Sequence, residues 1–159
     1  MDRAQAKLTA PRLVFAAVAL VVFVVDRITK ELVSRQVPYG TEQPVIGHFV
    51  GITDIHNSGA AFGFAPAGAS LFLIAGLAVA IGLVVYVARN PGGLWTDAAL
   101  GLILGGTVGN LFDRIVYGTV TDFVNFHFWP VFNAADSAVS IGVVALAAGY
   151  ILRKDPHAS

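Results

Sequence analysis

The sequence has no cysteine and few charged residues. The lack of cysteine excludes disulfides, thiol nucleophiles and zinc sites built on cysteine. Charged residues make up only 13% of the chain, about half the roughly 25% of soluble domains. Ten basic residues balance ten acidic ones, so no net charge attracts nucleic acid, which is not an expected partner. Hydrophobic residues are abundant instead, at 56% with a mean hydropathy of +0.73, and this predicts a protein of the lipid bilayer.

Long apolar segments define the expected spans. A helix needs about 20 residues to cross a bilayer, and only Ser70–Ala88 reaches that length without polar neighbours. The other segments need flanking charged residues on the same helices, and these residues must then face protein or water. We therefore expect one mainly α-helical membrane domain, residues 1–159, with four transmembrane helices at about 12–30, 69–88, 96–114 and 136–153.

Basic residues orient these spans. Six of the ten lie on one side of a four-span arrangement: Arg3, Lys7, Arg12, Arg89, Arg153 and Lys154. By the positive-inside rule both termini are cytoplasmic, and the polar ends of the spans face outward. The first apolar segment could instead be the core of a cleaved signal peptide, but the bulky and charged stretch 24–27 offers no small-x-small cleavage site.

The outer loop, at about 34–66, is expected to hold a small extracytoplasmic β-sheet. Residues 45–52 are β-prone and glycine-rich, which predicts a short strand pair on the membrane surface. Residues 60–64 predict an interfacial segment with aromatic rings at headgroup depth. Within the third span, Gly101, Gly105 and Gly109 recur every four residues, which predicts close packing against a neighbouring helix.

Two aspartates are the candidate catalytic residues. Asp122 follows the third span between apolar neighbours, and Asp136 lies at the start of the fourth. The segment between them, 123–135, has no charged residue, so it can lie at the interface and bring the two carboxylates together. Two close carboxylates in a site of low dielectric cannot both ionise easily, so one keeps a proton. One can then activate water while the other donates to a scissile carbonyl, as in aspartic proteases.

Other roles are compatible with these residues. An aspartate at a helix start is often a cap, and carboxylates in membranes also relay protons. Asp26 and Lys30 are four residues apart and are typical of a structural ion pair, and Asn133 could cap the fourth helix. The four histidines show no metal-ligand spacing. We therefore expect no metal and no cofactor.

Five stretches carry a resemblance to a known family. Their order and spacing resemble lipoprotein signal peptidase, or signal peptidase II, over nearly the whole chain. Thr121 and Val139 depart from the more usual Val and Ile, but neither bears on the chemistry. The stretches are Asp26–Lys30, Asn57–Phe62, Gly105–Arg114, Val120–Phe123 and Phe132–Ser137.

The resemblance implies an inner-membrane aspartyl peptidase with an outward-facing active site. It implies cleavage of prolipoproteins just before a cysteine that bears a diacylglyceryl group, contact with membrane lipid, and inhibition by the cyclic peptide globomycin. Asp122 and Asp136 match the catalytic dyad. The residues that match pocket and supporting positions are Asn57, Gly59, Asn110, Asp113, Arg114, Asn133, Asp26 and Lys30.

Two other classes of function stay open at this point. A small proton-coupled transporter could use the same carboxylates, although such sites lie near the bilayer midplane within repeated halves, and the sequence shows no repeat. A structural subunit held together by its glycine faces would leave the polar cluster at the span ends without a role.

Overall fold

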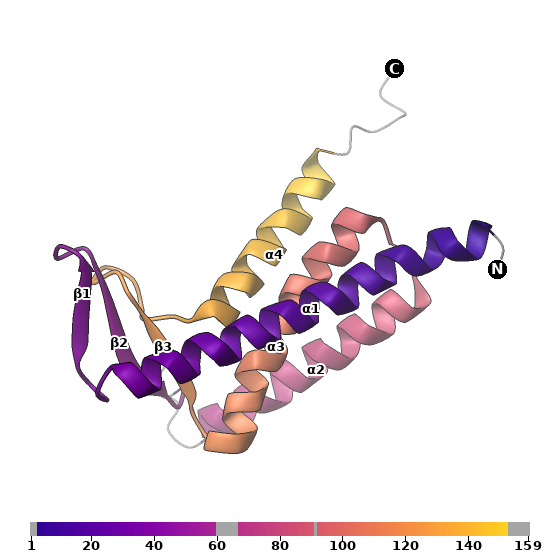
Figure 1. Ribbon diagram of the computed structural model, residues 1–159. Helices are drawn as coiled ribbons and strands as arrows, with labels where there is room; N and C mark the ends of the chain where they lie inside the picture. Colours follow the sequence, from indigo (N-terminus) through magenta and orange to yellow (C-terminus); the bar gives the residue numbers. More distant parts are fainter. Residues whose placement is uncertain (1–2, 60–66, 91, 153–159) are drawn as a thin grey trace.

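The computed structural model describes residues 3–59, 67–90 and 92–152. Within these ranges, four helices and three strands follow one another (Figure 1). The predicted interfacial segment at 60–64 lies outside the described residues. The elements are α1 (Arg3–Gln36), β1 (Glu42–Ile46), β2 (Val50–Asn57), α2 (Ala67–Arg89), α3 (Leu94–Tyr117), β3 (Val120–Asn125) and α4 (Ala134–Ile151).

The helix α3 is the centre of the bundle, with α1, α2 and α4 packed around it. Its glycines make this possible. A side chain at Gly101 would meet the backbone oxygen of Phe15 on α1 at 2.7 Å, and one at Gly106 would overlap the backbone of Ala135 on α4. Because these positions of α3 carry no side chain, both neighbouring helices pack directly against its backbone. The four-residue glycine interval predicts this kind of close packing.

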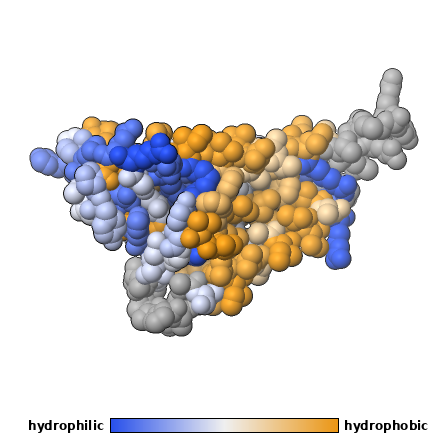
Figure 2. Space-filling view, turned by 60° about the horizontal axis from the view of Figure 1, so that its bottom comes forward, coloured by the Kyte–Doolittle hydropathy of each residue, from blue (hydrophilic) through white to orange (hydrophobic). Residues whose placement is uncertain are grey.

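The outside of the bundle is apolar, as a lipid environment requires. Figure 2 shows a hydrophobic band over the helices, with hydrophilic residues gathered at the end that carries the sheet and in a smaller group at the opposite end. Among the described residues, three helices are long and apolar enough to cross a membrane: Ser70–Arg89 in α2, Leu94–Tyr117 (α3) and Ala134–Ile151 (α4). The expected crossing of the membrane by α1 stays a prediction.

The 34 residues of α1 make a helix of about 51 Å, longer than the roughly 30 Å apolar core of a bilayer. Its C-terminal part therefore extends to the sheet, where the Gln43 side chain donates to the backbone oxygen of Gln36. The sheet is antiparallel in the order β1-β2-β3. It contains the predicted strand pair and adds a third strand, β3, which the sequence interpretation did not foresee. Because β3 carries Asp122, this pairing brings a candidate catalytic residue beside the end of β2.

Candidate active site

Asp136 lies in the first turn of α4, where a capping box holds it. The Asn133 side chain accepts a hydrogen bond from the Asp136 backbone N–H at 2.9 Å, and the Asp136 carboxylate accepts the Asn133 backbone N–H at 3.2 Å. This reciprocal arrangement satisfies two amides that begin a helix and fixes the direction of the carboxylate. The prediction that Asn133 caps this helix is confirmed.

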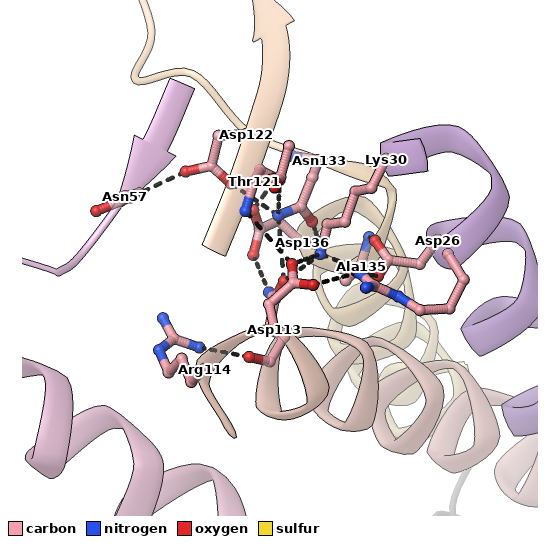
Figure 3. Close-up of polar contacts among 12 residues, drawn as sticks. Asp26, Lys30, Asn57, Asp113, Arg114, Thr121, Asp122, Asn133, Ala135 and Asp136 are labelled. Atoms are coloured by element: carbon pink, nitrogen blue, oxygen red, sulfur yellow. Dashed lines mark hydrogen bonds and ion pairs between the residues drawn. The ribbon is translucent and has the colours of Figure 1, made fainter. Parts of the chain in front are cut away.

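Asp122 on β3 is only 4% exposed and is held by two side-chain amides (Figure 3). Asn57, the last residue of β2, donates to Oδ2 at 2.9 Å, and Asn133 donates to Oδ1 at 2.7 Å. Asn133 therefore contacts both aspartates, Asp122 through its side-chain nitrogen and Asp136 through its backbone nitrogen. The fold brings the two predicted carboxylates to one polar site.

Asn110 of α3 connects this site to a nearby positive charge. Its side-chain nitrogen donates to Asp136 Oδ1 at 2.8 Å. Its side-chain oxygen accepts from Lys30 Nζ at 2.9 Å and from the Asn133 side-chain nitrogen at 3.1 Å. With both ends bonded, the Asn110 amide has one orientation, and it presents a donor to Asp136.

Burial decides the protonation of Asp122. Loss of solvent raises the pKa of this carboxyl from its ordinary value of 3.8 to about 6, and the negative charge of Asp136 acts in the same direction. Hydrogen bonds from Asn57 and Asn133 and the positive charge of Lys30 oppose the rise. The site therefore favours a neutral carboxyl close to an ionisable one, which is the arrangement that acid–base chemistry needs.

Four charged residues lie next to the aspartates and form what we call the charge cluster: the buried Asp26, Lys30 and Asp113, and Arg27, whose side chain is 19% exposed. Lys30 Nζ lies 2.9 Å from Asp26 Oδ2 and 2.8 Å from Asp113 Oδ2. The Arg27 guanidinium lies 3.1 Å from Asp26 and 2.6 Å from Asp113. Both carboxylates are fully buried and Lys30 is 3% exposed, so two acids and two bases balance each other inside the protein.

The charge cluster also holds the backbone immediately before each candidate catalytic residue. Asp26 Oδ1 accepts the backbone N–H of Ala135 at 3.0 Å, and Asp113 Oδ2 accepts that of Thr121 at 3.3 Å. The pair that the sequence predicts between Asp26 and Lys30 is present, and it belongs to this larger cluster. One group of charges on α1 and α3 thus fixes the backbone that carries both aspartates.

The remaining predicted residues lie close by but make fewer contacts. The backbone N–H of Gly59 donates to the Asn57 side-chain oxygen at 2.8 Å and so orients the amide that reaches Asp122. Arg114 donates to the backbone oxygen of Asn110 at 3.3 Å, and its guanidinium lies 5.4 Å from the centre of the Phe72 ring. The positive charge of Arg114 therefore lies between α2 and α3.

Sequence reasoning did not identify Arg27 as part of the site. Its guanidinium bridges Asp26 and Asp113, and it lies 4.8 Å from the centre of the Phe112 ring. The available signal was its position inside the stretch Asp26–Lys30, one residue from a charge that must be buried. Arg27 is a second cation that balances a second acid, Asp113 of α3. Asp113 lies far away in the sequence, so this pairing could not be read from the stretch itself.

Fold and site together define an integral membrane protein with two carboxylates joined through the buried Asn133. Residues 18–152 match the family model described as signal peptidase (SPase) II. The lipoprotein signal peptidase of Halothermothrix orenii is 39% identical over 129 residues, covering 81% of this chain and 89% of that protein. The lipoprotein signal peptidase of Cupriavidus necator is 39% identical over 153 residues, with 91% and 87% covered.

A solved structure described as a bacterial membrane enzyme, determined by the in meso method at 1.9 Å, superposes with a TM-score of 0.81 at 30% identity. The match covers 88% of this chain and 94% of that one. The chain belongs to the signal peptidase II family, and it is a protease that removes signal peptides from lipoproteins.

Proposed function

We propose that the chain is an aspartyl endopeptidase that cuts diacylglyceryl-modified prolipoproteins just before the lipidated cysteine. The observation that carries the proposal is the pair Asp122 and Asp136, bonded through the same residue, Asn133. The raised pKa of Asp122, about 6, favours one proton held by the pair under mildly acidic conditions. A transporter would use carboxylates near the bilayer midplane, whereas these lie at a helix start and in the sheet.

In the proposed reaction the ionised carboxylate of the pair takes a proton from a water molecule, whose oxygen attacks the scissile carbonyl. The neutral carboxyl donates its proton to the carbonyl oxygen. When the tetrahedral intermediate collapses, the C–N bond breaks and the new amino group of the cysteine takes a proton from one carboxyl of the pair. The other carboxylate takes the proton of one hydroxyl of the intermediate, so the pair again holds one proton. The proton belongs to the pair as a unit, and the burial of Asp122 favours holding it there.

Asn57, Asn110 and Asn133 orient the two carboxylates in this scheme through amide hydrogen bonds. Arg114 lies within electrostatic range of both aspartates, and we assign to it the orientation of substrate carbonyl groups. Globomycin, a cyclic peptide that mimics the substrate, is expected to occupy the same site.

We further propose that the protein lies in the bacterial inner membrane with both termini in the cytoplasm and the aspartates facing outward. The basic residues outside the expected spans support this orientation. The lipid anchor of the precursor could then stay in the outer leaflet while its cysteine backbone reaches Asp122 and Asp136. Each buried CH₂ group of an acyl chain contributes about 0.8 kcal/mol, and this binding can orient the scissile bond.

The test is a gel-shift cleavage assay with purified protein in detergent. The substrates are a diacylglyceryl-modified prolipoprotein and the same precursor without lipid. We expect cleavage of the lipidated form only, and its loss in Asp122→Asn and Asp136→Asn. Asp97→Asn is the matched control, because Asp97 is also buried, at 1% exposure, but lies at the opposite end of α3. Full activity of either dyad variant would exclude the proposed chemistry.

A further inference from the structure

A second polar network lies on the sheet, apart from the two aspartates. Glu42 on β1 pairs with Thr53 of β2. Gly51 lies two residues before Thr53 on β2, on the same face of the sheet, and pairs with Asn125 of β3. The Glu42 carboxylate reaches across β2. Its Oε2 accepts from Asn125 Nδ2 at 2.6 Å, and its Oε1 lies 2.9 Å from His127 Nε2. Glu42 thus joins β1 to the end of β3, although the two strands do not pair directly.

Gly51 is what lets the Glu42 side chain lie across the middle strand. A Cβ built on Gly51 would lie 2.5 Å from Glu42 Cδ and 2.6 Å from Oε1. Any side chain at this position must therefore displace the carboxylate from its partners. A glycine inside a strand commonly marks such a close approach.

The contact with Glu42 fixes a tight turn. His127 has φ of 62°, a conformation uncommon for residues other than glycine. Its backbone N–H donates to the Asn125 side-chain oxygen at 2.9 Å, and Asn125 and His127 both bond to Glu42. The hydrogen bonds of Glu42 therefore hold the point where the chain leaves the sheet. The connection 126–132, which we call the aromatic loop, begins there and returns toward α4 (Figure 1).

The other end of the aromatic loop is also attached to β3. The Phe132 backbone oxygen accepts from Phe123 N at 3.0 Å and from Val124 N at 2.8 Å. Between the two ends, the ring of Phe126 stacks on Phe128 at 5.9 Å and meets Phe132 edge-on at 5.3 Å. Phe126 thus joins Phe128 and Phe132 into one cluster of rings, of which Phe128 remains 82% exposed. The placement of the loop depends on both of its attached ends.

These rings line a cavity of about 420 Å³ together with Asp136, Ser140 and Ile141 of α4. The cavity is largely apolar, because aromatic and aliphatic side chains make up most of its lining beside Asp136, Ser137 and Ser140. An apolar group bound there lies directly beside one of the two carboxylates.

We infer that Glu42, lying across Gly51, is a positioning residue that holds the aromatic loop so that the cavity beside Asp136 accepts an apolar group of the lipoprotein precursor. This inference rests on the proposed function. The hydrogen bond from Asn125 also keeps the pKa of Glu42 below its ordinary value, so the carboxylate stays ionised and can accept from both partners at neutral pH.

The experiment compares Glu42→Ala, Gly51→Ala and the double variant. Both single changes remove the same contact, so we expect each to raise KM about three- to ten-fold with kcat nearly unchanged. The double variant should be no worse than Glu42→Ala. Glu31→Ala removes an exposed acid paired with Arg35, and Gly82→Ala adds a methyl group that meets nothing within 4 Å. Neither of these controls should change KM.

A second measurement reports the loop directly. The chain has two tryptophans, Trp95 on α3 and Trp129 in the aromatic loop, so 5-fluorotryptophan labelling gives two fluorine resonances, assigned with Trp129→Phe. We expect Glu42→Ala and Gly51→Ala to shift or broaden the Trp129 resonance and to leave that of Trp95 in place. A general loss of stability would not select one tryptophan.

Three results would overturn the inference: an unchanged Trp129 resonance, a shifted resonance with unchanged KM, or additive effects in the double variant. Failure of the wild type to cleave any lipidated precursor would instead refute the proposed function, and the fluorine spectra would still test the contact. Precursors with short and long acyl chains identify the bound group. A KM increase that grows with chain length assigns the cavity to an acyl chain, and an equal increase assigns it to a peptide side chain.

Discussion

Lys30 gives the sharpest test of the buried charge cluster. Its ammonium group contacts Asp26, Asp113 and Asn110 at 2.8 to 2.9 Å, and the side chain is 3% exposed. Lys30→Met keeps the unbranched apolar stem of the side chain, one atom shorter, but removes the charge. Within the charge cluster, two buried carboxylates are then balanced by the single guanidinium of Arg27, and the cluster carries an uncompensated negative charge next to Asp122 and Asp136.

The expected cost is large. Removing one partner of a buried charge pair costs about 3–5 kcal/mol, a substantial part of the roughly 5–15 kcal/mol that stabilises a typical domain. At about 2–4 °C per kcal/mol for a chain of this size, the melting temperature in detergent should fall by roughly 10 °C. Activity at a temperature where the variant is folded should also fall, because Asp26 and Asp113 hold the backbone of Ala135 and Thr121.

A second substitution separates charge balance from packing. Asp113→Asn in the Lys30→Met background restores neutrality and keeps an oxygen that can accept the Thr121 N–H. The double variant should therefore be more stable than the sum of the two single changes by about 0.5–3 kcal/mol. Arg35→Met is the control, because the Arg35–Glu31 pair is exposed and such pairs contribute at most about 1 kcal/mol.

Thermal unfolding followed by intrinsic fluorescence measures the wild type, the two single variants, the double variant and the Arg35→Met control under the same detergent and salt. A melting temperature of Lys30→Met within about 2 °C of the wild type would refute the reasoning. So would strict additivity in the double variant, since it would mean that the four charges do not compensate one another.

Two further predictions follow from the pKa of Asp122 and from the glycines of α3. Because folding raises the pKa of Asp122 from 3.8 to about 6, the folded state binds its proton more tightly. The stability that this group contributes is complete below pH 3.8 and is lost as pH rises through about 6. Melting temperatures between pH 4 and 7.5 should thus fall less in Asp122→Asn than in the wild type, and parallel curves would contradict the assignment. Gly105→Val should destabilise the protein by about 1–3 kcal/mol, since a Cβ there meets the Ala19 backbone oxygen at 2.6 Å. A melt that matches Gly82→Ala, where the methyl group has open space, would show that α1 does not pack there.

The parts of the site that could be predicted from the sequence are those whose residues lie close together along the chain. Asn133 and Asp136 are three residues apart, and Asp26 and Lys30 are four apart. Helix geometry alone brings such pairs together, so the cap and the ion pair could be predicted without knowing the fold. The four-residue interval of glycines on α3 is a local pattern of the same kind.

The third strand, β3, could not be predicted from such local patterns. Residues 120–125 alternate imperfectly and carry a charge, so nothing local distinguishes a strand from an interfacial loop. They form β3 because β2 offers them an edge, and β2 lies some 65 residues earlier in the chain, as the Asn57–Asp122 bond shows. Strand pairing is a contact between distant segments, and its register is not specified by either segment alone.

The sequence by itself determined the membrane character, the helices of the bundle, the Asn133 cap of α4 and the choice of Asp122 and Asp136 as candidate residues, because these depend on composition, on periodicity and on a set of stretches in a recognisable order. Only the tertiary structure decided how the charges are compensated. Lys30 meets Asn110 across 80 residues, and Asp26 reaches the Ala135 amide across 109. Those contacts require the bare glycine backbone of α3 to bring α1 and α4 together, so the placement of the carboxylates follows from helix packing that no local pattern encodes.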